Sequence, residues 1–378
     1  MGWPDGWAWE IPVAVRATAI DATLSNWTAI LTEATLPDHV FDHAQNGGGD
    51  LRFYGGKNGT NRLACDVRIF DTANGIADIA VLIPTVSSTV DTVIYLRYGK
   101  AGVSQPAPSE PYGQYASYDE YTVGVWSLNE DPSGTAPQMK NRASNLFHGT
   151  AQNLSQESGM AGNAARFVDN PRGRAMLGIG ALSLALHGSP AITMSSWFRP
   201  AAFRTAASNQ NIQIACWISN SEFGFSFGID ATVSPERLYM ASRSTSGEST
   251  QILLGAQVGV PLHAWSSLAC VNDYSAKTQS AFVNGQLTGH RTTTWSKDSY
   301  TSVSNDSNFQ DAIGYDGFDP ANRQPSGLID EARLANTSRS AAWIAADYRN
   351  LKYPAAFWAP ASPRSNNRRR RLLLACGG

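Results

Sequence analysis

The sequence predicts an all-β protein built as two consecutive β-sandwiches. Charged residues make up only 16% of the 378 residues, whereas hydrophobic residues make up 42%. Glycine (33) and proline (19) are frequent, which favours short strands joined by turns over long charged helices. A chain of this length exceeds one ordinary hydrophobic core and suits two domains.

Residues 1–100 are predicted to form a small N-terminal sandwich. Apolar and polar residues alternate from Leu63 to Phe70, as they do in a half-buried strand. Residues 101–118 are rich in proline, serine and glycine, so they are predicted to be a linker. The other strands expected in this domain cover 12–17, 50–54, 79–83 and 92–98.

Residues 119–350 are predicted to form the second, larger sandwich. Short strands recur there with turn residues between them. Asn284-Gly285 directly follows an apolar strand and is a strong hairpin signal. One helix is expected at 339–350, with Ser338 as its N-cap. The expected strands cover 121–128, 164–167, 192–198, 212–218, 223–229, 238–241, 251–254, 265–271, 279–283 and 328–334.

Residues 351–378 are predicted to be a tail that belongs to neither sandwich. Several prolines interrupt it, and a basic block is followed by three leucines. Such a tail suits anchoring on an acidic, partly apolar surface of a neighbouring subunit, and a loose solvated terminus is the alternative. The basic block consists of Arg368, Arg369, Arg370 and Arg371.

Charge and cysteine usage exclude several kinds of partner. The formal net charge of −2 provides no overall field that would attract nucleic acid or an acidic membrane. No apolar run reaches the roughly 18 residues of a membrane-spanning helix, so no membrane insertion is expected. The four cysteines form no C-x-x-C pair, which argues against a zinc or redox motif.

Several fragments of the second domain, taken in order, resemble a laminin-G-like member of the concanavalin A-like lectin/glucanase superfamily. They begin with Val125-Trp126-Ser127-Leu128 and end with Gly327-Leu328-Ile329-Asp330-Glu331. The resemblance implies that this domain is a concanavalin A-like jelly roll. The fragments cover 125–131, 145–150, 159–167, 192–198, 282–285 and 327–334, the last leading into 339–344.

The first domain resembles a small β-sandwich family of bacteria and phages that has no assigned activity. The resemblance is carried by Asp50-Leu51-Arg52-Phe53, by 63–71 and by 91–99. Members of that family commonly precede a lectin-like domain, and the order of the two domains here agrees with this habit.

No enzyme activity is predicted, although the superfamily includes glycoside hydrolases. Hydrolysis needs two carboxyl groups that point into one cleft. Glu130-Asp131 and Asp330-Glu331 are adjacent pairs, which would point to opposite faces of an extended strand. His39 and His43 lie four residues apart in the first domain and are predicted to be surface or turn histidines rather than metal ligands.

The resemblance implies one possible cofactor, a Ca²⁺ ion held by loop carboxylates. Calcium takes six to eight oxygen ligands. Asp330 is the main candidate, with Asp131 and Asp169 as partners. The alternative is that Asp330 accepts hydrogen bonds from backbone amides in a buried turn.

Carbohydrate binding is predicted in the long polar segment 295–322, because sugar sites combine aromatic faces with a few polar groups. A solvated loop without a function is the alternative. The aromatic candidates are Trp295, Tyr300, Tyr315 and Phe318, and the acidic residues near them are Asp306, Asp311, Asp316 and Asp319.

These features predict a non-enzymatic protein on the surface of a bacteriophage particle, in the tail or decorating the head. Lectin-like domains act outside cells, yet the sequence starts at Met1 without a secretion signal, so release by lysis is expected. The expected partners are other virion proteins, copies of the chain itself and a cell-surface glycan. The alternatives are a secreted, extracellular bacterial adhesin and a polysaccharide-degrading glycoside hydrolase.

Overall fold

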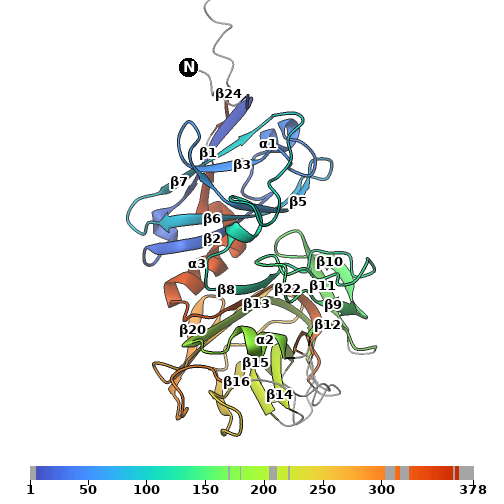
Figure 1. Cartoon of the computed structure of the whole chain (residues 1–378), viewed down its shortest axis with the longest axis vertical. Helices are drawn as coiled ribbons and strands as arrows, with labels where there is room; N and C mark the ends of the chain where they lie inside the picture. Colours follow the sequence, from blue (N-terminus) through green and yellow to red (C-terminus); the bar gives the residue numbers. More distant parts are fainter. Residues whose placement is uncertain are drawn as a thin grey trace, which may run out of the picture. The chain divides into compact units, whose positions relative to one another are not determined.

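The computed structural model describes residues 6–168, 171–178, 180–203, 211–219, 222–302, 311–315, 323–360 and 362–365. Over these residues the chain is nearly all β, as predicted, with a few short helices (Figure 1). It divides into two compact units. The first contains the described residues up to Asp119 and those from Arg349 onward, and the second is Glu120–Tyr348.

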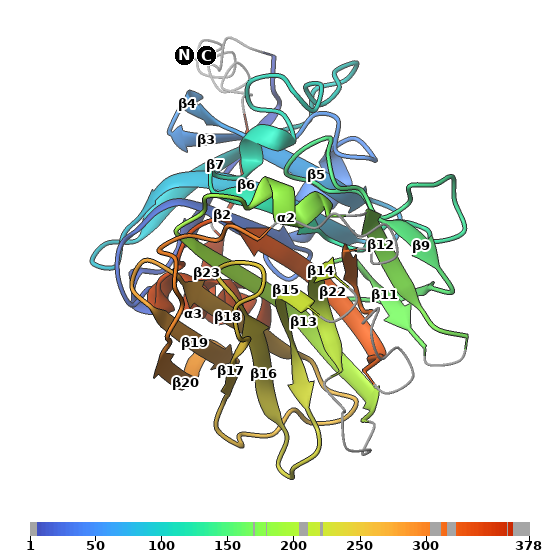
Figure 2. The ribbon, with the colours of Figure 1, turned by 60° about the horizontal axis from the view of Figure 1, so that its bottom comes forward.

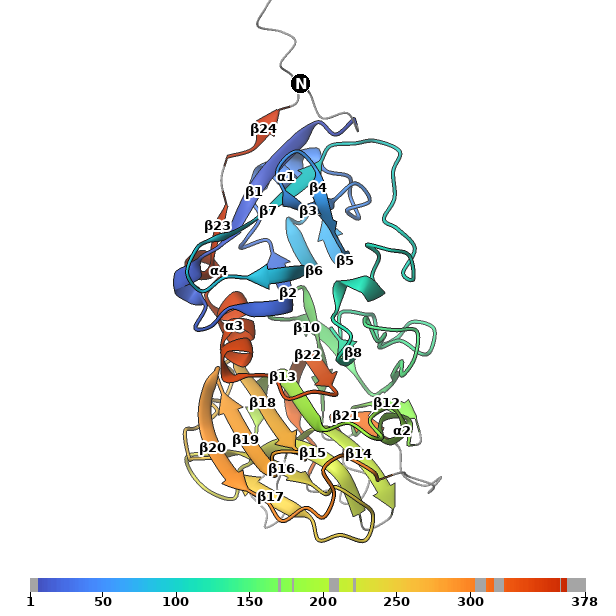
Figure 3. The same cartoon turned by 60° about the vertical axis from the view of Figure 1, so that its left-hand side comes forward.

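The first unit contains two antiparallel sheets, which appear as separate layers in Figure 3. One sheet has the order β23-β1-β7-β3-β4, with β24 also paired to β1, and the other has the order β2-β6-β5. Its strands are β1 (Trp9–Val15), β2 (Leu24–Thr32), β3 (Arg52–Gly56), β4 (Thr60–Leu63), β5 (Cys65–Asp71), β6 (Ile76–Val86), β7 (Thr92–Tyr98), β23 (Trp358–Pro360) and β24 (Arg364–Ser365). Its short helices are η1 (Ala17–Ala19), α1 (Asp38–His43), η2 (Tyr115–Ser117) and α4 (Pro354–Phe357).

The strand predicted at Leu63 to Phe70 is in fact two strands in different sheets. β4 ends at Leu63 and belongs to the larger sheet, whereas β5 begins at Cys65 and belongs to the smaller one. The chain crosses between the sheets at Ala64, which is buried. Leu63, Ala64 and Cys65 are all apolar, and no glycine or proline marks the crossing, so the sequence pattern did not reveal it.

The C-terminal segment completes the first unit, so the predicted tail outside both sandwiches is wrong for the described residues. β23 pairs antiparallel with β1, with Trp358 opposite Val15. The side chain of Trp358 is buried. Pro360 ends β23 at the edge of the sheet, where a missing N–H interrupts no central ladder of hydrogen bonds. In Figure 3, β23 and β24 run beside β1.

The residues predicted as a linker, 101–118, pack against the first unit instead of spanning open solvent. The side chain of Arg52 donates a hydrogen bond to the carbonyl of Ser104 at 2.5 Å. Gln105 donates from its amide to the carbonyls of Gly48 and Leu51. These contacts fix the irregular backbone without a strand ladder.

The second unit is a sandwich of two antiparallel sheets (Figures 1 and 2). The eight-stranded sheet has the order β10-β11-β22-β13-β18-β19-β20, with β8 paired to β22, and the seven-stranded sheet has the order β17-β16-β15-β14-β21-β12-β9. The strands are β8 (Thr122–Trp126), β9 (Thr150–Gln152), β10 (Ser155–Ser158), β11 (Asn163–Phe167), β12 (Arg174–Gly178), β13 (Ala191–Ala202), β14 (Ile212–Ser219), β15 (Glu222–Asp230), β16 (Arg237–Ser242), β17 (Gln251–Leu254), β18 (Ser266–Asp273), β19 (Thr278–Val283), β20 (Gln286–Thr292), β21 (Asp311–Ile313) and β22 (Ser326–Ala335). The helices are α2 (Ala181–Ala185) and most of α3 (Ala341–Lys352), whose last residues, from Arg349, belong to the first unit.

The core of the second unit lies between its two sheets. Phe198 and Ile329 from the eight-stranded sheet belong to the same buried cluster as Phe227 and Met240 from the seven-stranded sheet. Alternate residues of each strand enter this core, which is the pattern that predicted a sandwich. Within the described residues, no helix is long and apolar enough to cross a membrane.

Two local signals of the second unit are confirmed, one with a shifted boundary. Asn284 and Gly285 both have positive φ, 51° and 75°, and join β19 to β20 as a hairpin. The predicted helix exists as α3, but it begins at Ala341. Its N-cap is Ser340 and not Ser338, because the Ser340 hydroxyl accepts a hydrogen bond from the backbone N–H of Trp343 at 3.2 Å.

Candidate functional site

The seven-stranded sheet has an inner face, which contributes to the core, and an outer face. Successive side chains of a strand point to opposite faces. On β12, Ala175 and Leu177 lie in the core, so Arg174 lies on the outer face. On β9, Ala151 packs against the core and the neighbouring Gln152 points outward. Side chains of this sheet that do not enter the core therefore lie on its outer face.

The middle of the outer face is closed to solvent. Ala215, Ser226 and Ala241 lie opposite one another on β14, β15 and β16, and all three are fully buried. At the β9–β12 end of the sheet, by contrast, Arg174 is half-buried and Gln152 is exposed. The outer face is thus accessible at this end, as it also is at the opposite edge strand β17, where Ile252 and Leu254 are exposed.

Arg174, Gln152 and Tyr315 form a polar and aromatic group there, which we call the Arg174 site. Arg174 lies opposite Gln152 in the antiparallel register of β12 and β9. Its Nε donates a hydrogen bond to Oε1 of Gln152 at 2.5 Å. Its guanidinium carbon lies 4.6 Å from the centroid of the Tyr315 ring. Two independent contacts therefore fix the position of the guanidinium group.

Tyr315 reaches Arg174 because the chain turns at Gly314. Tyr315 follows β21, whose Ile313 lies in the core, and a continued strand would point Tyr315 inward as well. Gly314 has a φ of +68°, which breaks this alternation. A Cβ atom at Gly314 would lie only 2.2 Å from the ring of Phe167, so no larger residue fits.

The Arg174 guanidinium retains unused hydrogen-bonding capacity. Among the residues that the structure describes, its Nη1 and Nη2 atoms donate no hydrogen bond and no carboxylate forms an ion pair with it. Arg237, on β16, differs, because its Nε lies 2.9 Å from Oδ2 of Asp230. Arg174 is therefore a positively charged group whose terminal nitrogens are open to a ligand.

The carboxylate of Asp230 is committed to local contacts. It accepts hydrogen bonds from the backbone N–H and hydroxyl of Thr232 and from Arg237. Burial opposes ionisation of this group, but the hydrogen bonds from Thr232 and Arg237 outweigh it and hold the pKa of Asp230 below its usual range. Such a carboxyl is unsuited to act as a general acid near neutral pH.

Of the four aromatic residues predicted to bind carbohydrate, Tyr315 is the one that the structure places at the Arg174 site. Trp295 and Tyr300 were expected on an exposed loop, which is wrong: Trp295 is 3% exposed and Tyr300 is fully buried. Both belong to the sandwich core, where the rings of Trp295 and Tyr274 lie 4.5 Å apart. Phe318 lies outside the described residues.

The acidic residues predicted beside these aromatic residues are either buried or outside the described residues. Asp311 is not on an exposed loop but on β21, fully buried, and its Oδ2 accepts a hydrogen bond from the backbone N–H of Leu182. Asp306, Asp316 and Asp319 lie outside the described residues.

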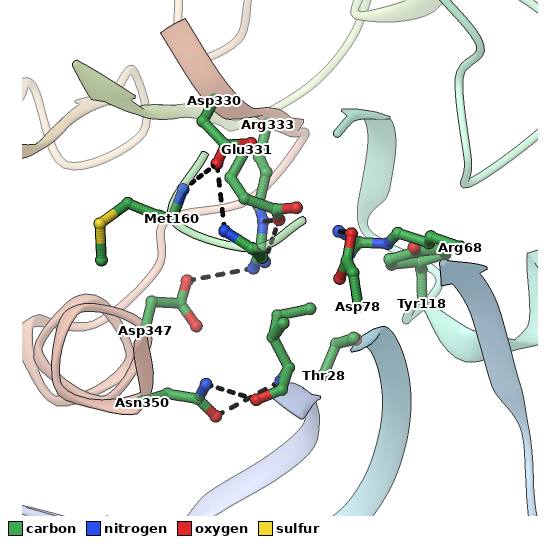
Figure 4. A network of polar contacts seen from close by, with 12 residues as sticks. Thr28, Arg68, Asp78, Tyr118, Met160, Asp330, Glu331, Arg333, Asp347 and Asn350 are labelled. Atoms are coloured by element: carbon green, nitrogen blue, oxygen red, sulfur yellow. Dashed lines mark hydrogen bonds and ion pairs between the residues drawn. The ribbon is translucent and has the colours of Figure 1, made fainter. Parts of the chain in front are cut away.

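The two described carboxylates predicted to hold calcium are engaged in separate hydrogen-bonding groups. Oδ2 of Asp330 accepts from the backbone N–H groups of Met160 and Ala161, at 2.6 and 3.2 Å (Figure 4). Asp131 is exposed, and its Oδ1 accepts from the N–H and hydroxyl of Ser133 within one turn. The third candidate, Asp169, lies outside the described residues. Across the described ranges, no three histidine, cysteine or acidic side chains come together as a metal site.

The basic block Arg368, Arg369, Arg370 and Arg371 also lies outside the described residues, so its anchoring role stays a prediction. Sequence reasoning missed Arg174 and Gln152. The alternation Arg174-Ala175-Met176-Leu177 was a usable signal, because it predicts a strand with Arg174 on its polar face.

A family model for the concanavalin A-like lectin/glucanases superfamily matches residues 179–345. The match covers much of the second unit, including β13 to β22, and agrees with its two-sheet topology. The second unit therefore contains a concanavalin A-like domain, as the sequence fragments implied. The comparison with curated proteins gives no match.

Three solved structures illustrate what the fold is similar to. A native heptameric SAP-like pentraxin from Limulus polyphemus is 15% identical, with a TM-score of 0.33, over 42% of this chain and 69% of the pentraxin. Domain 4 of an extracellular arabinanase from Geobacillus stearothermophilus, in complex with arabinotriose, is 16% identical, with a TM-score of 0.35, over 60% and 98%. The binding domain of botulinum neurotoxin DC, in complex with SialylT, is 11% identical, with a TM-score of 0.42, over 62% and 52%.

Proposed function

We propose that this chain is a non-enzymatic glycan-binding protein and that the Arg174 site contacts the glycan. The observation that carries the proposal is the half-buried Tyr315 ring beside a guanidinium with two open nitrogens and an exposed amide. Sugar sites combine an apolar ring face with a few convergent polar groups. The matched superfamily includes lectins, which supports a glycan as the ligand.

The carboxylates favour binding over hydrolysis. Asp230 lies on the outer face of the sheet, because the neighbouring Ile229 of β15 enters the core, and its hydrogen bonds keep it ionised. Glu331, which the sequence placed in an acidic pair, is buried and lies 2.7 Å from Arg333. A hydrolase needs one carboxyl group that stays protonated and a second one nearby. We therefore propose no catalytic residue.

We place this glycan-binding module on the surface of a bacteriophage particle, with other virion proteins as neighbours. The order of a small sandwich before a lectin-like domain, which resembles phage and bacterial surface proteins, supports this setting. Detection of the chain by mass spectrometry in purified phage particles would agree with it, and recovery only from bacterial envelopes would favour the adhesin alternative.

Binding of the full chain to a glycan array tests the proposed function. Tyr315→Ala is expected to weaken binding about two- to tenfold, because an aromatic contact contributes about 0.5–1.5 kcal/mol and tenfold corresponds to about 1.4 kcal/mol. Tyr112→Ala is the matched control: Tyr112 is exposed in the first unit and also carries a stacked arginine, Arg62, at 4.8 Å. It is expected to bind like the wild type.

Two results would contradict the proposal. One is the absence of binding to any glycan by a folded wild-type chain, and the other is equal binding by wild type and Tyr315→Ala. Release of reducing sugar ends from a bound polysaccharide would instead show that the chain is a hydrolase.

A further inference from the structure

We infer that the glycan is acidic and that Arg174 binds its carboxylate. This inference rests on the proposed function, because it names the class of ligand for the same site. Its physical basis is the shape and fixation of one guanidinium group.

The contacts of Arg174 leave one particular edge of the guanidinium open. The Nε side is occupied by the hydrogen bond to Gln152, and the guanidinium carbon lies over the Tyr315 ring. The end that carries Nη1 and Nη2 remains, and two parallel N–H donors on this end match the two oxygens of a carboxylate. A bidentate ion pair is therefore the interaction that this geometry favours.

Fixation of the side chain also lowers the cost of binding. A free arginine loses side-chain entropy when a ligand immobilises it, at about 0.5–1.5 kcal/mol for one flexible side chain. Arg174 is held before the ligand arrives, by a stacked ring and a hydrogen bond from different strands or turns. Arg62 in the first unit stacks on Tyr112 but, within the described part of the chain, lacks such an anchoring hydrogen bond.

The charge around Arg174 points to an anionic partner. Three other arginines of the second unit have an acidic partner in the chain: Arg166 pairs with Glu157, Arg237 with Asp230 and Arg333 with Glu331. Arg174 has none among the described residues, although it lies on the sheet face that we assign to the ligand. At a sugar site, a preorganised cation without an acidic partner among the described residues selects a sugar that carries a negative charge.

Two kinds of sugar provide a carboxylate on a pyranose ring, namely uronic acids and sialic acids. The test measures affinities of the full chain by calorimetry for a glucuronic acid-terminated oligosaccharide, a sialic acid-terminated one and the carboxyl-reduced, neutral form of each. The wild type is expected to bind at least one acidic form about tenfold or more tightly than its neutral form, and the better of the two acids identifies the source.

Gln152→Glu is the most specific variant. It keeps the size of the side chain on an exposed edge strand but supplies a carboxylate that pairs with Arg174 and competes with the ligand. We expect about a tenfold loss of affinity for the acidic glycan and a smaller loss for the neutral one, because Gln152 belongs to the glycan site itself. Arg174→Ala is expected to act in the same direction. Arg172→Ala removes an exposed positive charge two residues away and is expected to have no effect.

The outcomes distinguish a failure of this inference from a failure of the proposed function. Equal wild-type affinity for acidic and neutral forms, or an acidic affinity that Gln152→Glu and Arg174→Ala leave unchanged, overturns the inference while glycan binding stands. If Arg172→Ala loses as much affinity for the acidic glycan as Arg174→Ala does, the inference is overturned as well, because equal losses indicate general charge attraction. No binding to either acidic oligosaccharide by a chain that binds other glycans overturns the inference, whereas no binding to any glycan of the array overturns the proposed function itself.

Discussion

The side-chain amide of Asn350 forms with Ile30 the two hydrogen bonds that a neighbouring strand would form. Its Oδ1 accepts from the backbone N–H of Ile30 at 3.3 Å, and its Nδ2 donates to the carbonyl of Ile30 at 2.6 Å (Figure 4). Ile30 lies on β2, the edge strand of the three-stranded sheet in the first unit. One side chain from the end of α3 thus satisfies an open strand edge 320 residues away in sequence.

Asn350→Ala is expected to destabilise the first unit. The substitution leaves a buried N–H and a buried carbonyl without partners, which costs about 1–3 kcal/mol for each group. We expect the free energy of unfolding to fall by about 2–4 kcal/mol in urea denaturation followed by circular dichroism. Lys352→Ala, an exposed position one residue beyond Leu351 in the same helix, is the control and should change it by less than about 0.5 kcal/mol. Equal effects of the two variants would show that the amide contacts contribute nothing.

Trp358→Ala is expected to show that the first unit depends on its C-terminal strand. Trp358 is 1% exposed and pairs with Val15 in β1. Removal of a fully buried tryptophan typically costs about 3–5 kcal/mol. The same denaturation measurement checks this value, with Val90→Ala, at a position that is 65% exposed, as the control. A loss below about 1 kcal/mol would mean that β23 is dispensable.

Strand positions could be predicted from the sequence because alternation is a local property. The expected strands at 92–98 and 251–254 coincide with β7 and β17. The pairing of β23 with β1 could not be predicted in this way, because its two partners lie at opposite ends of the sequence and a segment of three residues has no readable period.

The candidate site was only partly predictable for a different reason. Aromatic residues in a polar segment look alike in sequence whether they face solvent or the core. Trp295 and Tyr300 fill the sandwich interior, whereas Tyr315 reaches the surface through the turn at Gly314. Its partner Arg174 lies on a strand about 140 residues earlier, so only the folded sheet brings them together.

The histidine pair of the first unit is expected to make stability fall in mild acid. The rings of His39 and His43 are stacked with centroids 4.0 Å apart, and Nδ1 of His39 lies 2.9 Å from the hydroxyl of the buried Tyr98. Burial, and then the nearby His43, lower the pKa of His39, while Asp42 opposes this. The folded state therefore favours the neutral ring.

The direction of this pH dependence follows from the linkage between protonation and folding. A base whose pKa is lowered on folding contributes its full stability above the unfolded value of about 6.5 and loses it as the pH falls below that value. The unfolding free energy of the wild type should decline between pH 7 and pH 5, and His39→Gln should reduce this decline. His187→Gln, at an exposed position of the second unit, should leave the decline unchanged. An identical pH dependence in wild type and His39→Gln would refute the assignment.

Asp330→Asn is expected to destabilise the second unit and also to test for calcium. The neutral amide oxygen accepts the N–H groups of Met160 and Ala161 less strongly than a carboxylate does, which costs about 1–3 kcal/mol. If Asp330 binds no calcium, added Ca²⁺ will not change the unfolding temperature of the wild type. A calcium-dependent rise in the wild type that is absent from Asp330→Asn would support the ion that the sequence resemblance implies.

Asp230→Asn is expected to lower the stability of the second unit at neutral pH but not in strong acid. Hydrogen bonds from Thr232 and Arg237 hold the pKa of Asp230 below its ordinary value, so the carboxylate is favoured in the folded state. An acid with a lowered folded pKa contributes stability above the unfolded value of about 3.9 and loses it as the pH falls through the folded pKa. The difference in unfolding free energy between wild type and Asp230→Asn should therefore be largest near pH 7 and shrink below about pH 4. Asp298→Asn is the control, because it removes an exposed ion pair with Lys277. The unfolding free energy at pH 7 should change less in Asp298→Asn than in Asp230→Asn. A larger change in Asp298→Asn would show that burial beside Arg237 does not strengthen the interaction of Asp230.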